Sequence, residues 1–99
     1  MAKRKIIWSH RAKIKLYSIL EFYSKRNKSN TYSTSLYKNF DKEVKKLTDY
    51  PDLGIKTEMR SIRGLIIKNH VFYYEVNHNS IIIHTIWDSR QNPEDLEIK

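Results

Sequence analysis

Apolar residues recur at steps of three and four positions through the first half of the chain. The first series comprises Ala12, Leu16, Ile19, Leu20 and Tyr23, and the second comprises Tyr32, Leu36, Phe40, Val44 and Leu47. This spacing puts each series on one face of a helix, which predicts one helix at about residues 9–26 and another that follows residues 27–30 and runs to about Asp49. Ser9 can cap the first helix, and Pro51 stops the second. Because the connection is short, we expect an antiparallel helical hairpin.

The second half changes to short runs of β-branched and aromatic residues, which are typical of strands. The pattern predicts strands at about residues 57–62, 65–76 and 80–87, a turn at residues 77–80, and a short first strand at residues 6–8. We therefore expect an α+β fold, with a short N-terminal strand, the helical hairpin and then an antiparallel three-stranded meander. One face of the sheet would pack on the helices and the other would stay free for function.

Two polar aromatic residues of the predicted sheet are expected to be structural. His70 alternates with Phe72 and Tyr74, so it should face the helices and lie in the core. Trp87 ends the last β-branched run, where its indole should close one end of the core with its N–H hydrogen-bonded.

Composition limits the class of protein. The chain has 99 residues, 39% of them hydrophobic, and no cysteine. It is long enough for one domain, residues 1–99, and it is neither fibrous nor disulfide-stapled. The apolar stretch behind Lys3, Arg4 and Lys5 is too short for a secretory signal, and no run is long enough to span a membrane. We expect a cytoplasmic protein with no membrane partner.

Charge is concentrated in the helical half. Residues 1–50 contain thirteen lysines and arginines against four acids, whereas residues 51–99 contain six against seven. This asymmetry favours an anionic partner, such as nucleic acid, a ribosome or an acidic protein segment, although a solvated lysine surface has the same composition. The candidate partner-binding residues cluster on the polar side of the second helix and are Lys38, Lys42, Lys45 and Lys46.

Several chemistries are excluded by the motifs that are missing. The chain has no glycine-rich phosphate loop and no Cys/His ligand cluster, so we expect no cofactor and no metal site. What remains is a series of cations along the predicted sheet, namely Lys56, Arg60, Arg63, Lys68 and Arg90, with His70 and His84 nearby. Cleavage of RNA through its 2′-hydroxyl needs a base, an acid and cations that hold the phosphate, which Arg and His can supply. His84 is the better histidine candidate because alternation places it on one face with Asp88 and Arg90.

The order of elements and several local motifs resemble the RelE/ParE toxins of type II toxin-antitoxin systems. The motifs are Trp8-Ser9 before the first helix, Leu47, Pro51 and Gly54 after the second, Arg60, Tyr74-x-Val76, Ile81-Ile82-Ile83, and Trp87-Asp88-Ser89-Arg90-Gln91-Asn92-Pro93. The resemblance covers nearly the whole chain. It implies a strand, a helical hairpin and an antiparallel sheet, together with a cognate antitoxin that wraps and neutralises the toxin in a hetero-oligomer.

The resemblance also implies one of two targets. RelE-type toxins cut mRNA in the ribosomal A site, whereas ParE-type toxins poison DNA gyrase without a recognised nuclease centre. The chain has Val71 where RelE-type nucleases carry an arginine, and its carboxyl end lacks their Tyr or His. These departures favour a gyrase inhibitor; if the chain is instead a nuclease, its candidate catalytic residues are Arg60, Arg63, His84 and Arg90. A non-toxic nucleic-acid-binding domain is the alternative from another class.

Overall fold

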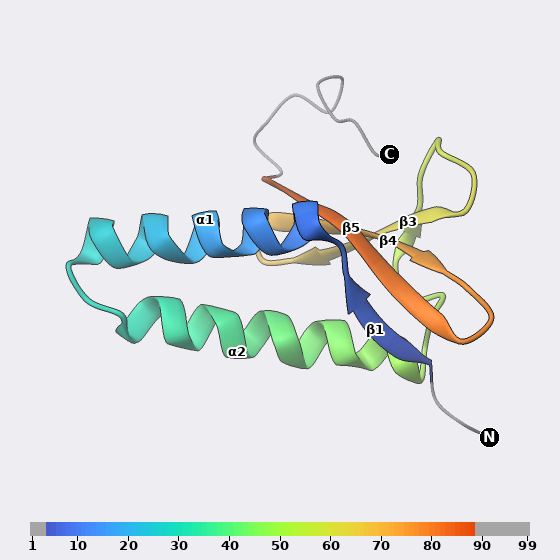
Figure 1. Ribbon diagram of the computed structural model, residues 1–99, viewed down its shortest axis with the longest axis horizontal. Helices are drawn as coiled ribbons and strands as arrows, with labels where there is room; N and C mark the ends of the chain where they lie inside the picture. Colours follow the sequence, from blue (N-terminus) through green and yellow to red (C-terminus); the bar gives the residue numbers. More distant parts are fainter. Residues whose placement is uncertain (1–3, 89–99) are drawn as a thin grey trace.

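The computed structural model describes residues 4–88, and it is an α+β fold as the sequence predicts. The elements are β1 (Lys5–Trp8), α1 (His10–Asn27), α2 (Thr31–Lys45), the 3₁₀ turn η1 (Lys46–Thr48), β2 (Ile55–Lys56), β3 (Ile62–Ile67), β4 (His70–Val76) and β5 (Ser80–Asp88). Figure 1 shows α1 and α2 running side by side as a helical hairpin beside the twisted sheet. None of the described helices is long and apolar enough to cross a membrane.

The first helix begins at the cap that the sequence predicts, whereas the residue before α2, Asn30, makes no capping hydrogen bond with its side chain. Ser9 is in an extended conformation and its Oγ accepts a hydrogen bond from the Ala12 backbone nitrogen at 3.0 Å, so it caps α1 as predicted.

Between the helices, the Ser33 hydroxyl donates to the Leu20 carbonyl oxygen at 2.7 Å and contacts the Ser24 hydroxyl at 2.8 Å. This polar contact fixes the register of the helical hairpin because Ser33 is buried.

The sheet has five strands in the order β1-β5-β4-β3-β2. β1 pairs parallel with β5, and the other pairs are antiparallel. The predicted strand at residues 65–76 is wrong, because the chain reverses at Lys68 and Asn69 and forms β3 and β4 instead. Lys68 adopts a left-handed φ of 56° there without a glycine to mark the turn. The predicted strand at residues 57–62 is also wrong, since the strand is Ile55–Lys56 and residues 57–61 form a loop.

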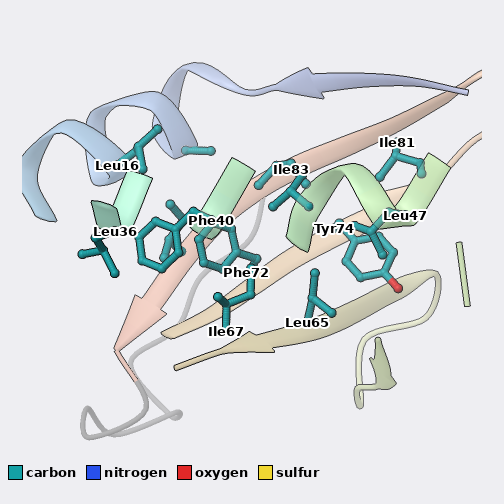
Figure 2. Close-up of a cluster of buried hydrophobic side chains, with 13 residues drawn as sticks. Leu16, Leu36, Phe40, Leu47, Leu65, Ile67, Phe72, Tyr74, Ile81 and Ile83 are labelled. Carbon is teal, nitrogen blue, oxygen red and sulfur yellow. The ribbon is translucent and has the colours of Figure 1, made fainter. Parts of the chain in front are cut away.

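One face of the sheet packs on the helices and forms the core (Figure 2). Phe40 of α2 lies edge-on to Phe72 of β4, with ring centroids 4.9 Å apart. His70 is buried against the same Phe40 ring at 5.5 Å, which confirms its predicted place in the core. The opposite face carries Ile7, Ile55 and Ile66, which are about half exposed or more. We call it the open face.

Candidate functional site

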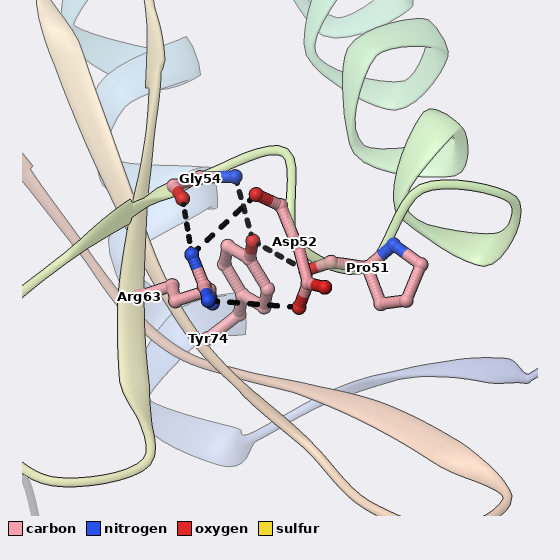
Figure 3. Close-up of polar contacts among 5 residues, drawn as sticks. All are labelled: Pro51, Asp52, Gly54, Arg63 and Tyr74. Atoms are coloured by element: carbon pink, nitrogen blue, oxygen red, sulfur yellow. Dashed lines mark hydrogen bonds and ion pairs between the residues drawn. The ribbon is translucent and has the colours of Figure 1, made fainter.

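The position of Arg63 is fixed by a cluster of polar contacts at the edge of the core (Figure 3). The Tyr74 hydroxyl accepts a hydrogen bond from the Gly54 backbone nitrogen at 2.8 Å and donates one to the Pro51 carbonyl oxygen at 2.7 Å. Arg63 Nη1 donates to the Gly54 carbonyl oxygen at 2.9 Å, and Nη2 lies 3.6 Å from Oδ1 of Asp52. Burial raises the pKa of Tyr74, so the hydroxyl stays protonated and can donate. The Pro51–Gly54 segment and Arg63 are thus held together through one phenol.

Arg60 and Arg63 meet at a cavity of about 400 Å³ beside the loop that joins β2 to β3. Lys56 of β2 and Ser61 of the loop line it too, as does Asp52, whose carboxylate faces Arg63. We call this space the loop cavity. The structure therefore brings together the first two of the candidate catalytic residues.

His84 lies elsewhere, on the open face. Tyr73 pairs with Thr85 and Tyr74 pairs with Ile83, so His84 is the extra residue of a β-bulge in β5. Its Nε2 is 3.0 Å from Oε1 of Glu75, and both side chains are about two-thirds buried or more. A carboxylate in this position can orient an imidazole for proton transfer.

The residues that lie on the same face as His84 differ from those that the sequence predicts. Asp88 pairs with His70 and lines a groove against α1 with Lys15, so it lies on the helix side of the sheet. The expectation that His84 and Asp88 share a face is wrong, because the extra residue reverses the alternation between them. The partner of His84 is Glu75, which sequence reasoning missed. Its signal was a single carboxylate in the apolar run of β4, but the register that pairs Glu75 with Ile82, two residues before His84, has no sequence marker.

The candidate catalytic residues do not form one cluster within the described part of the chain. Arg63 pairs with the buried Tyr74, which places its side chain on the helix side, whereas His84 is on the open face. Arg90 lies outside the described residues. Among residues 4–88, no group of three or more His, Asp or Glu side chains can hold a metal ion.

The lysines of the second helix divide into two pairs. Lys45 contacts Asp41 at 2.8 Å and Lys46 contacts Glu43 at 2.8 Å. The hydrogen bond from Lys45 to Asp41 raises the pKa of the Lys45 ammonium group. Lys38 and Lys42 are exposed, and neither has an ion pair with another described residue. The free positive charge of this surface is therefore carried by Lys38 and Lys42.

Trp87 is only half-buried, and its surroundings differ from the prediction. The ammonium group of Lys15 lies 5.3 Å from the centre of its ring. The indole Nε1 is buried, yet no acceptor within residues 4–88 reaches it. The expectation of a hydrogen-bonded N–H is therefore wrong for the described part of the chain, where the residue paired with Trp87 is Val71, whose side chain has no acceptor.

Comparison with known proteins gives one family and one fold. Residues 6–93 match the family model described as "ParE toxin of type II toxin-antitoxin system, parDE". The chain is also similar to a solved structure titled "Chromosomal ParDE TA system from P. aeruginosa", with a TM-score of 0.76 and 18% sequence identity. That similarity covers 87% of this chain and 96% of the other. No curated protein matches the chain significantly.

Proposed function

The chain belongs to the ParE toxin family of type II toxin-antitoxin systems, and on this basis we propose that it inhibits growth by acting on DNA gyrase. The observation that carries the proposal is the match of residues 6–93 to the ParE family model. Inhibition of gyrase does not require the protein to cleave RNA. Basic and apolar surface would bind the target, and no side chain would act as a base.

The arrangement of polar groups supports a binding function over RNA cleavage. A nuclease needs its base, its acid and its phosphate-holding cations around one reacting group. Within residues 4–88, Arg63 and His84 lie on opposite sides of the sheet. Val71 of β4, which pairs with Trp87, stands where RelE-type nucleases carry an arginine. The open face therefore has no cation at this position.

An acidic antitoxin segment is the proposed partner of the second helix. Lys38 and Lys42 present positive charge with no carboxylate of their own among the described residues, and Lys45 and Lys46 extend the same surface. A segment rich in Asp and Glu would bind there and form the neutralising complex, with an affinity that falls as salt rises.

A ribosome-dependent mRNA endonuclease is the second candidate, and the contact between His84 and Glu75 favours it. A carboxylate that orients a half-buried imidazole is a recurrent way to position a general base. In that mechanism His84 would abstract the 2′-hydroxyl proton, and Arg60, Arg63 and Arg90 would bind phosphate at a site completed by the ribosome and its mRNA.

Two measurements on the induced toxin separate these functions. We expect the purified protein to inhibit supercoiling by purified gyrase, and primer extension on cellular mRNA to show no codon-phased cuts. Co-expression of the neighbouring antitoxin gene should restore growth. Codon-phased cuts that disappear in His84→Gln, with supercoiling unaffected, would establish the nuclease function instead. Binding to nucleic acid without growth arrest would support the non-toxic binding domain.

A further inference from the structure

The residues that line the loop cavity include neither the α2 lysines nor the contact between His84 and Glu75. The loop between β2 and β3 projects from the sheet at the end of the molecule away from the α1–α2 turn (Figure 1). The cavity volume of about 400 Å³ is in the range of small-ligand sites. Its lining comes from Asp52, from Lys56 of β2, from the loop, from the start of β3 and from Val76 at the end of β4.

Positive charge in the loop cavity exceeds negative charge. Lys56, Arg60 and Arg63 line it against the single carboxylate of Asp52, which already faces Arg63 at 3.6 Å. The exposed side chains of Lys56 and Arg60 make no hydrogen bond or ion pair with any described residue. Glu58 belongs to the same loop but does not line the cavity. An anion entering the cavity would therefore meet two cations that have no internal partner.

The cavity is held in shape before any ligand arrives. The Thr57 hydroxyl lies 2.9 Å from the Ile62 carbonyl oxygen, and it accepts from the Met59 backbone nitrogen at 3.2 Å. The Thr57 backbone nitrogen also donates to the Ile62 carbonyl oxygen, at 3.3 Å, which closes the loop at its base. Arg63 is fixed by Gly54 and Asp52 and is mostly buried. A preorganised site loses less conformational entropy on binding.

One of the three described non-glycine residues with a positive φ lines the loop cavity. Ser61 has a φ of 71°, in the left-handed region that residues with a Cβ avoid. Strained residues persist where the surrounding structure enforces them, and they occur often in ligand-binding segments. The left-handed conformation of Ser61 turns the chain from Arg60 back into β3, and Arg60 and Arg63 line one cavity.

We propose that the loop cavity binds a phosphate group, presented either by a nucleotide as a monoester or by a nucleic-acid backbone as a diester. Guanidinium forks match phosphate oxygens in pairs, and Lys56, which pairs with Arg63 in the sheet, adds a point charge. The hydroxyl of Ser61 is a further donor at the rim. None of the residues of this site belongs to the α2 lysines or to the contact between His84 and Glu75, so the proposal does not rest on gyrase inhibition. Arg60 and Arg63 are shared with the endonuclease candidate, and the gyrase and primer-extension assays test that function separately.

The test uses the full chain with three probes: adenosine 5′-monophosphate, a ten-nucleotide single-stranded DNA, and adenosine as a phosphate-free control. Backbone amide NMR signals of residues 57–63 report binding. We expect the monophosphate, the DNA or both to shift these signals, and adenosine to leave them unchanged. Shifts with the monophosphate alone identify a nucleotide site, and shifts with the DNA alone identify a backbone site.

Matched variants separate this site from general attraction to a basic protein. Lys56→Gln/Arg60→Gln should weaken binding by on the order of tenfold or more, since charge-assisted hydrogen bonds are lost. For the DNA, the slope of log K against log salt should fall by about 0.7 per lost contact. Lys38→Gln/Lys42→Gln removes the same charge from α2 and should change binding less than about twofold. The proposal is overturned if neither phosphate probe shifts the loop signals, or if the two double variants bind alike. An unchanged melting temperature for Lys56→Gln/Arg60→Gln verifies its fold, and Arg60→Lys supplies a milder second variant.

Discussion

The ring of Tyr74 occupies the space that a side chain on Gly54 would need. A Cβ atom at Gly54 would lie 2.6 Å from Cε1 of Tyr74 and 2.7 Å from its hydroxyl oxygen. This close approach lets the phenol bond to the backbone on both sides of Asp52, and the carbonyl oxygen of Gly54 in turn holds Arg63. Tyr74, a residue of the core, thus holds in place the backbone that positions Arg63 in the loop cavity.

Tyr74→Phe should destabilise the protein by about 1–3 kcal/mol, because it leaves a buried N–H and a carbonyl oxygen without their partner. Urea denaturation measures the change. Tyr73→Phe is the matched control on the open face, and it should alter the free energy of unfolding by less than about 0.5 kcal/mol. Equal losses in the two variants would show that the phenol contacts of Tyr74 contribute little.

Alkaline pH should weaken the fold through the same residue. Burial raises the pKa of Tyr74 above the ordinary value of 10.0, and it raises the pKa of Tyr73 in the same direction. As pH rises through about 10, the unfolded chain therefore loses these protons before the folded chain does, and the free energy of unfolding falls. The decline between pH 8 and pH 10.5, followed by urea denaturation, should be shallower in Tyr74→Phe. Parallel curves for the two proteins would contradict this assignment.

Relief of strain at Ser61 should stabilise the chain. Ser61→Gly removes the Cβ that disfavours a φ of 71°, with an expected gain of about 1 kcal/mol that is partly offset by backbone entropy in the unfolded state. Ser61→Ala keeps the Cβ and should bring no such gain. Thermal unfolding of both variants is the measurement, and a lower melting temperature for Ser61→Gly than for Ser61→Ala would rule out strain at this position.

Trp87 should tolerate phenylalanine better than alanine. Trp87→Phe removes a buried N–H that no described residue accepts, which offsets part of the lost contact area, so we expect a change within about 1 kcal/mol. Trp87→Ala should lose about 2–3 kcal/mol, since the ring is half-buried. Denaturation curves compare them, and an equally large loss in both would indicate that the N–H is hydrogen-bonded in the folded protein.

Antitoxin binding should depend more on Lys38 and Lys42 than on Lys45 and Lys46. Lys38→Glu/Lys42→Glu reverses two charges that lack internal ion pairs, and it should slow association and flatten the salt dependence of the affinity. Lys45→Glu/Lys46→Glu alters lysines whose charge is already shared with Asp41 and Glu43, so its effect should be smaller. Surface plasmon resonance at two salt concentrations distinguishes the pairs. If neither double variant changes the association rate, the antitoxin binds elsewhere.

The helices could be predicted from the sequence because their apolar spacing is local and complete. The reversal at Lys68 was missed although Lys68-Asn69 interrupts the apolar run, because the left-handed position is held by a lysine and not by the glycine that usually marks such a turn. The contact between His84 and Glu75 could not be predicted from the sequence either. It depends on the register that pairs Glu75 of β4 with Ile82 of β5, which is a long-range property of the sheet.

The parallel pairing of β1 with β5 delays folding during synthesis. Lys5 to Trp8 can pair only after Ser80 to Ile83 have left the ribosome, because β1 has no other neighbour in the sheet. At typical elongation rates of about 5–20 residues per second, the intervening residues 9–79 take on the order of 4–15 s to be made. Throughout that interval the first strand and the helices it would precede lack their sheet. The five-stranded sheet is therefore completed only after residues 80–83 have been made, so the described fold forms after most of its own synthesis rather than during it.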